Sequence, residues 1–187
     1  NPGLFIDSCA SGGRRNDLET MRRAVPLLRS DFQFPVMAGV VEGNQGHTYG
    51  LSFWLPFQGQ GVYSYDAYSF RSFCMASFGM GRLTPENTAA QQQAYPECRQ
   101  IAPLMLFGDY YPLTPYSLQL DQWIAWQFNR PKEGDGVVQA FRRPKSAVSD
   151  MKFMLQGLDS TARYSVKNLD TSDIVEISGK ELMEEGL

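Results

Sequence analysis

The predicted fold of this chain depends on residues 1–32, which read NPGLFIDSCASGGRRNDLETMRRAVPLLRSDF. The apolar run Leu4–Ile6 is typical of a buried parallel strand, and the polar, glycine-containing stretch Cys9–Arg15 follows it. Apolar residues then recur at roughly helical spacing from Leu18 until Pro26 ends the pattern. The stretch therefore predicts a strand, a loop and a helix, in that order.

A second strand is predicted directly after this helix. The short apolar segment Val25–Leu28 leads into the polar residues Arg29–Asp31. In a parallel α/β sheet, ligands bind at the carboxyl ends of the strands, and glycines let the backbone approach a ligand closely. The residues predicted to surround one mouth are Cys9, Gly12, Arg15 and Asp31.

These two segments carry a resemblance to a known family. Residues 7–18, DSCASGGRRNDL, followed at the right distance by Ser30 and Asp31, resemble the Cys-Ala-Ser-Gly-Gly-Gly-Arg and Ser-Asp motifs of the α-galactosidases of glycoside hydrolase family thirty-six. The likeness continues to the C-terminus. It implies a retaining hydrolase that removes a terminal α-linked galactose, or a related α-glycoside, from an oligo- or polysaccharide.

The resemblance also implies roles for individual residues. Asp31 matches the family's general acid/base, and Cys9 and Gly12 match residues that line the pocket for the terminal sugar. Arg15 and Asp17 match the arginine and the aspartate that follow the glycines.

Four positions depart from the family pattern. Arg14 stands where a third glycine is usual, Leu28 and Arg29 replace Trp-Thr before Ser30, and Phe32 replaces an asparagine after Asp31. These differences indicate a divergent branch of the family.

A retaining glycosidase needs two carboxyl groups about 5–5.5 Å apart, and Asp31 supplies only the proton-transferring one. The family's nucleophile lies in a Lys-x-Asp-x-Asn segment on an earlier strand, and this sequence has no such segment. Asp7 and Asp17 are weaker candidates for the nucleophile. Asp17 is better explained as a helix cap or an arginine partner. We therefore expect the 187 residues alone to be inactive, and the reaction implies no metal or organic cofactor.

The stretch up to residue 112 predicts further alternation of strands and helices, which suits the second half of a (β/α)8 TIM barrel. Within it, Trp54 is a candidate platform for the apolar face of a sugar, although core packing also explains it. His47, the only histidine, has either a structural or a ligand-contacting role, and one histidine does not make a zinc site. The spacing of Val36, Met37, Val40 and Val41 predicts a short helix, followed by a loop, over Phe34–Gly50. A third strand is predicted over Leu51–Phe57, and a Gly/Gln loop follows it. The remaining predicted elements are a helix over Tyr63–Phe73, a final strand over Cys74–Gly81 and a helix from Thr84 to Pro103.

Residues 113–187 predict an all-β part, an antiparallel sandwich domain that is incomplete. Proline and tyrosine dominate the transition at 108–115, and separate β-rich runs follow it. These runs are residues 123–128, 136–142, 152–158, 162–168 and 174–177, and a turn is expected over 178–183.

Composition excludes several classes of function. A net charge of -3 with both signs spread along the chain offers no basic stripe for nucleic acid. No apolar run approaches the roughly 20 residues that a membrane helix needs. Three cysteines argue against a disulfide scaffold but leave one bridge open.

The first residues resemble the approach to an interior strand and not a signal peptide, which predicts a fragment that lacks the N-terminal half of its parent. Half a barrel exposes strand edges, so we also expect self-association.

Two other functions stay open from the residues alone. Cys9 and Arg15 have the spacing of the phosphate loop of cysteine phosphatases, although Ser8 and Asn16 depart from that pattern. The β part could instead be a carbohydrate-binding or structural module. Its candidate sugar platform is Trp123, Trp126 and Tyr164.

Overall fold

The computed structural model describes residues 1–9, 12–32, 34 and 38–187, and the chain divides into two units. One unit comprises residues 1–107 and 116–119, and the other comprises residues 108–115 and 120–187. The predictions made for Ala10, Ser11, Val36 and Met37 lie outside the described residues.

The first unit contains four short segments that pair in parallel, in the order of the chain. Asp7 forms a parallel bridge with Val25, and the next link joins Pro26–Arg29 to Gly59: the Gly59 amide donates to the Pro26 carbonyl at 2.8 Å and the Arg29 amide donates to the Gly59 carbonyl at 3.0 Å. Strand β1 (Gly59–Val62) then pairs in parallel with β2 (Ser77–Met80). The carboxyl ends of these segments therefore point to one edge.

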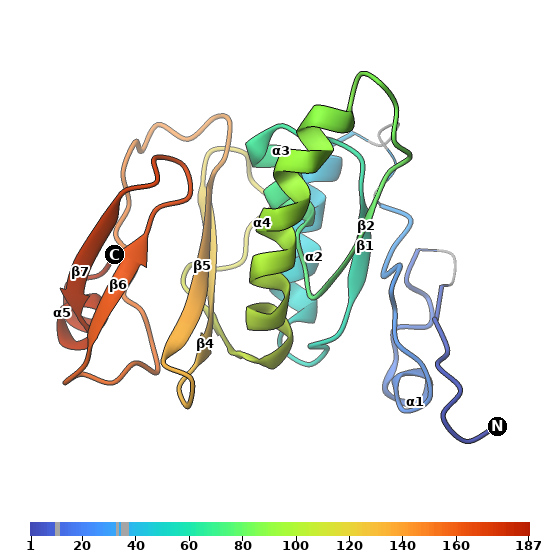
Figure 1. Ribbon diagram of the computed structural model, residues 1–187, viewed down its shortest axis with the longest axis horizontal. Coiled ribbons are helices and arrows are strands. Elements are labelled where there is room, and N and C mark those ends of the chain that lie inside the picture. The colour runs from blue at the N-terminus through green and yellow to red at the C-terminus, as the bar shows by residue number, and fades with distance from the viewer. Residues whose placement is uncertain (10–11, 33, 35–37) are drawn as a thin grey trace. The chain divides into compact units, whose positions relative to one another are not determined.

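The helices of this unit are α1 (Leu18–Met21), α2 (Val40–Leu51), α3 (Ala67–Phe73) and α4 (Thr88–Phe107). Helix α1 is shorter than predicted, because the chain must turn back for Val25 to pair with Asp7. Figure 1 shows α2, α3 and α4 beside the β1–β2 pair; α3 packs on β1, α4 on β2, and α2 on α3.

The predicted third strand over Leu51–Phe57 is wrong. Helix α2 continues to Leu51, and a turn follows in which the Trp54 amide donates to the Leu51 carbonyl at 3.1 Å. The strand is formed instead by the glycine- and glutamine-rich stretch that was predicted as a loop. Gln58 and Gln60 are buried there and hydrogen-bonded to other polar side chains, so the strand lacks the apolar pattern that usually reveals a buried strand.

The predicted short helix and loop over Phe34–Gly50 is also wrong, because α2 runs for 12 residues through three glycines. A Cβ atom at Gly43 would overlap the ring of Phe32, and one at Gly46 would contact Leu118. Close packing at these positions offsets the low helix propensity of glycine. His47 consequently lies in a helix and not in a loop.

The second unit is built from antiparallel strands, as predicted for the C-terminal part (Figure 1). Strands β3 (Asp109–Pro112), β4 (Trp123–Arg130) and β5 (Asp135–Arg142) form one sheet, and β6 (Arg163–Lys167) pairs with β7 (Ile174–Ser178) in another. The predicted strand over residues 152–158 is not formed. The expected turn at 178–183 is helix α5 (Gly179–Glu184), which a capping box between Ser178 and Glu181 starts.

Buried amides, and not apolar contacts alone, fix this unit. The Gln127 side chain exchanges two hydrogen bonds with the backbone of Gln156, at 2.9 and 2.8 Å, and Asn129 Nδ2 donates to the Gly157 carbonyl at 2.7 Å. These bonds replace a strand ladder for the segment around residue 156. They explain why its apolar residues do not form the predicted strand.

One disulfide links helices α3 and α4 of the first unit. Cys74 caps the end of α3, Cys98 lies in α4, and both are buried. The third cysteine, Cys9, is exposed and free. The bridge therefore closes a loop with a sequence separation of 24 between two packed helices.

Replacing Cys98 with alanine is expected to lower the free energy of unfolding by about 3 kcal/mol, because the bridge restricts the unfolded chain. Urea unfolding measures the change, and Cys9→Ala is the matched control that leaves stability unchanged. Equal loss in both variants, or none in Cys98→Ala, would contradict this assignment.

Candidate active site

The glycine-containing loop and the Ser30–Asp31 turn lie against each other. Asn16 Nδ2 donates to the Arg29 carbonyl at 2.9 Å, and a Cβ atom at Gly13 would clash with that same carbonyl. Gly13 also has a φ of +83°, which favours glycine. The sequence therefore brings the loop after the first parallel segment into contact with the end of the second.

The predicted site residues differ in exposure. Asp31 is half-buried, whereas Arg15, Gly12 and the Cys9 thiol are exposed. Ser30 is buried, and its Oγ accepts a hydrogen bond from the Phe32 amide at 3.0 Å, which closes a turn around Asp31. The carboxylate of Asp31 thus projects from a tight, hydrogen-bonded turn.

The two other carboxylates considered near this edge already have structural roles. Asp7 Oδ1 accepts a hydrogen bond from the Leu27 amide at 3.0 Å and so links the first two parallel segments. Asp17 caps α1, and its hydrogen bonds from Thr20, at 2.9 Å each, lower the pKa of its carboxyl group. Both carboxylates therefore accept hydrogen bonds that hold the local backbone.

A buried polar cluster behind the turn was missed by sequence reasoning. At its centre is Arg29, which is only 1% exposed. Its guanidinium donates to Gln58 Oε1 at 3.1 Å, to Thr48 Oγ1 at 3.1 Å, and to the Asn44 carbonyl at 3.0 Å. Gln60 Nε2 also donates to Asn44 Oδ1. The available signal was Arg29 itself, a charged residue at the end of a predicted buried strand.

The charge of Arg29 is held by neutral acceptors. No carboxylate pairs with it among residues 1–9, 12–32, 34 and 38–187, and burial lowers the pKa of its guanidinium to about 9. It is therefore still protonated at neutral pH. Burial, together with the positive charge of Arg29, lowers the pKa of His47 to about 4.

Because the folded chain binds the His47 proton more weakly than the unfolded chain, stability is expected to fall as pH drops from about 6.5 to about 4. Urea unfolding across this range checks the slope. His47→Gln should flatten the part of the slope due to this group, since no other histidine is present. An identical pH profile in the variant would show that His47 is not the cause.

Trp54 lies away from the edge that holds Asp31. The segment containing Trp54 joins the end of α2 to the start of β1, at the amino ends of the parallel segments. Asp31 follows the carboxyl end of its own segment, which pairs with β1. Trp54 is 40% exposed but is not part of the candidate site.

The structure does not provide the helix N-terminus that would bind phosphate in a cysteine phosphatase. The helix after Cys9 has four residues, and the carboxylate of Asp17 already occupies its N-terminus. An acidic cap at that position disfavours a bound phosphate.

The sugar platform proposed for the β unit is not assembled. Trp126 is 1% exposed, and its Nε1 donates to Gln139 at 2.9 Å in the core. Trp123 Nε1 donates to the Val148 carbonyl at 3.0 Å, and the Tyr164 hydroxyl accepts from the Asp159 amide at 2.9 Å. The three side chains serve packing and hydrogen bonding in separate places.

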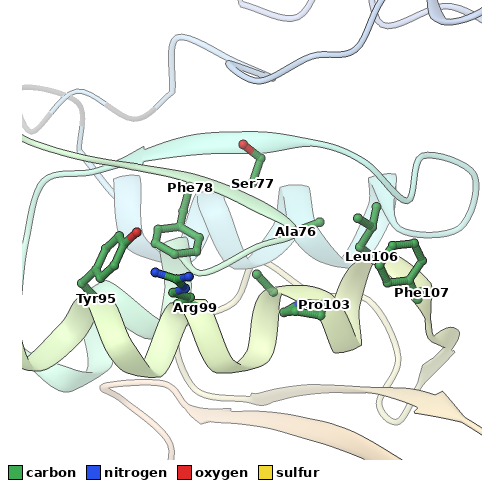
Figure 2. Close-up of a pocket in the computed structure, with 9 residues that line it drawn as sticks. Ala76, Ser77, Phe78, Tyr95, Arg99, Pro103, Leu106 and Phe107 are labelled. Atoms are coloured by element: carbon green, nitrogen blue, oxygen red, sulfur yellow. The ribbon is translucent and has the colours of Figure 1, made fainter. Parts of the chain in front are cut away.

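A separate open groove of about 390 Å³ lies between β2 and α4 (Figure 2). Phe78 and Tyr95 meet edge to face there, with ring centroids 5.7 Å apart, and Arg99 lies beside them. The groove contains no carboxyl group. It therefore does not compete with the Asp31 edge as a hydrolytic site.

The described part of the chain has neither a membrane-spanning helix nor a cluster of metal ligands. None of its helices is long and apolar enough to cross a membrane. Its histidine, cysteine, aspartate and glutamate side chains form no group of three or more that could hold a metal ion.

Comparison with known families identifies the C-terminal part. Residues 123–187 match the sequence model of the Glycosyl hydrolase family 36 C-terminal domain. Comparison with curated proteins finds no match.

Solved structures resemble the whole chain. The galactosidase domain of the α-galactosidase-sucrose kinase AgaSK is 20% identical over 100% of this chain and 27% of its own, with a TM-score of 0.77. An α-galactosidase from Lactobacillus brevis is 19% identical over 100% of this chain and 26% of its own, with a TM-score of 0.76. A variant of the family 36 α-galactosidase AgaA from Geobacillus stearothermophilus, in complex with 1-deoxygalactonojirimycin, is 21% identical over 97% and 26%, with a TM-score of 0.74.

These comparisons confirm the predicted resemblance to the α-galactosidases of glycoside hydrolase family 36. The chain spans about a quarter of the length of the solved relatives, and at this identity the likeness establishes the fold.

Proposed function

From the premise that residues 123–187 are a glycosyl hydrolase family 36 C-terminal domain and that the whole chain has the fold of α-galactosidases, we propose that it is part of a retaining α-galactoside hydrolase. Its substrate is an oligo- or polysaccharide with a terminal α-linked galactose or a related sugar. The first unit contributes the second half of a (β/α)8 barrel, and the antiparallel unit follows it. The predicted boundary at residue 112 moves to residue 107, because β3 belongs to the antiparallel sheet.

One observation carries this proposal. The glycine-containing loop and the Ser30–Asp31 turn meet through the hydrogen bond from Asn16 to the Arg29 carbonyl, at the carboxyl ends of parallel segments. Catalytic groups of barrel enzymes occupy this edge. Four successive segments with parallel pairing support the barrel.

Asp31 is the proposed general acid/base. It gives a proton to the glycosidic oxygen as the aglycone leaves and the sugar becomes bonded to the nucleophilic carboxylate, and then takes one from the water that attacks the glycosyl-enzyme intermediate. The proposed pocket for the terminal sugar is formed by Cys9, Gly12 and Arg15. Since Asp7 and Asp17 have structural roles, the nucleophilic carboxylate is proposed to come from another part of the complete protein.

In the complete protein, Asp31→Ala is expected to reduce kcat/KM by about 10²- to 10⁴-fold for alkyl or oligosaccharide α-galactosides. The loss should be smaller for an aryl α-galactoside with a good leaving group, because that group departs without a proton. Steady-state kinetics on the two substrate classes measures the difference.

Asp17→Asn is the matched control, since asparagine still caps a helix and the variant should keep the wild-type rates on both substrates. The 187-residue chain alone should hydrolyse neither. If the complete protein cleaves no α-glycoside, or if Asp31→Ala affects both substrates equally, the assignment of Asp31 fails.

Self-association is part of the same proposal. Within the described residues, β2 pairs on one edge only, and the groove beside Phe78 and Arg99 adjoins it. An unpaired parallel edge is a template for another strand. We propose that a further strand of the complete protein covers this edge and that the 187-residue chain uses a second copy instead.

Light scattering of the 187-residue chain should therefore give a mass above 21.1 kDa that rises with concentration. Gly79→Lys places a charge in open space on β2 and should shift the chain towards the monomer. A wild-type chain that stays monomeric at high concentration would refute the open edge.

A further inference from the structure

We propose that Arg29 and helix α2 together form the device that positions Asp31, with α2 holding the residues on both sides of the Ser30–Asp31 pair. The inference rests on the proposed function, since it concerns the placement of the proposed acid/base. Arg29 is a positioning residue here, because it acts through the turn and not on the sugar.

On the N-terminal side, the anchor is the guanidinium of Arg29. It bonds to two residues of α2, with 3.0 Å to the Asn44 carbonyl and 3.1 Å to Thr48 Oγ1, and to Gln58 just before β1. The Arg29 backbone is fixed as well, since its amide donates to the Gly59 carbonyl at 3.0 Å and its carbonyl accepts from Asn16 at 2.9 Å. The residue two positions before Asp31 is thus held by a helix, a strand and the glycine-containing loop.

On the C-terminal side, the anchor is a seat for Phe32 on the same helix. Asn44 Nδ2 donates to the Phe32 carbonyl at 2.9 Å, and the Phe32 ring meets His47 edge-on with centroids 6.0 Å apart. Gly43 leaves the space that the ring fills, because a Cβ atom there would overlap it. The residue directly after Asp31 therefore lies in a pocket on α2 that accepts one position of the ring.

Asn44 couples the two anchors. Its carbonyl accepts from Arg29, its Oδ1 accepts from Arg29 at 3.3 Å, and its Nδ2 donates to Phe32. A fully buried asparagine with all of these partners cannot move without breaking bonds on both sides of Asp31. The carboxylate is consequently fixed relative to α2, which a general acid needs for proton transfer within hydrogen-bond reach.

Two substitutions in the complete protein test the anchors separately. Arg29→Met keeps the length and apolar stem but removes the hydrogen bonds. Gly43→Ala leaves Arg29 intact, raises helix propensity and displaces the Phe32 ring. The matched control is Ser72→Ala, which removes a buried hydrogen bond of 3.0 Å between α2 and α3.

We expect both substitutions to lower kcat/KM for an alkyl α-galactoside by about 10²-fold, because a small misplacement of a catalytic group has an effect of that size. The loss should be less than about tenfold for an aryl substrate with a good leaving group, since that reaction depends less on the acid. A general loss of folding would affect both substrates alike. Gly43→Ala is the sharper variant, because a role in helix stability alone predicts no loss of rate.

Hydrogen exchange of the amides at residues 29–32 gives a readout that does not depend on activity. Exchange should rise at least about tenfold in Arg29→Met and Gly43→Ala and stay unchanged in Ser72→Ala. Unchanged exchange in the first two variants, or equal kinetic losses in the control, would overturn the positioning role. Raised exchange in a protein that cleaves no α-glycoside would support the anchoring and refute only the proposed function of Asp31.

Discussion

The buried guanidinium of Arg29 is the constraint on which the first unit depends. A cation inside a protein must find hydrogen-bond acceptors, and here all of them are neutral. This requirement explains why helix α2 carries the buried residues Asn44 and Thr48, and why Gln58 is buried just before β1. This polar contact between α2 and the segment before β1 adds to an apolar core that includes Val62, Phe73 and Met105. The Nε atom of Arg29 lacks a partner among the described residues, so the arrangement is not optimised for stability alone.

Sequence patterns predicted the elements whose burial is apolar and missed those whose burial is polar. The strands β4 and β5 follow apolar runs and were predicted close to their observed positions. The predicted buried strand at Leu4–Ile6 is wrong, because these three side chains are exposed and only Asp7 after them pairs, through one parallel bridge with Val25. The strand at Gly59–Val62 was missed because it contains two glycines and the buried Gln60, and glutamine ordinarily indicates a surface. Helix α2 was underestimated for a related reason, since its glycines are tolerated through contacts with residues distant in the sequence.

The candidate site divides in the same way. The motif residues Cys9, Gly12, Arg15 and Asp31 were predicted at one edge from the sequence, because parallel pairing brings successive carboxyl ends together. The contact that supports this prediction joins Asn16 of the loop to the Arg29 carbonyl. The cluster behind them could not, since its members come from three separate stretches whose proximity depends on the packing of α2. Trp54 was misplaced by the incorrect strand that contained it. The incorrect strand placed Trp54 at the wrong end of the parallel segments, although a tryptophan suits contact with a sugar.

The contact between Phe32 and Gly43 also constrains how this chain can diverge. The ring fills the space of a missing side chain on α2, so a larger residue at 43 and an aromatic residue at 32 exclude each other. A smaller, polar residue at 32, as in the family pattern, would remove that exclusion and permit alanine at 43. The two positions are therefore expected to covary among homologues, with glycine retained at one wherever an aromatic ring occupies the other.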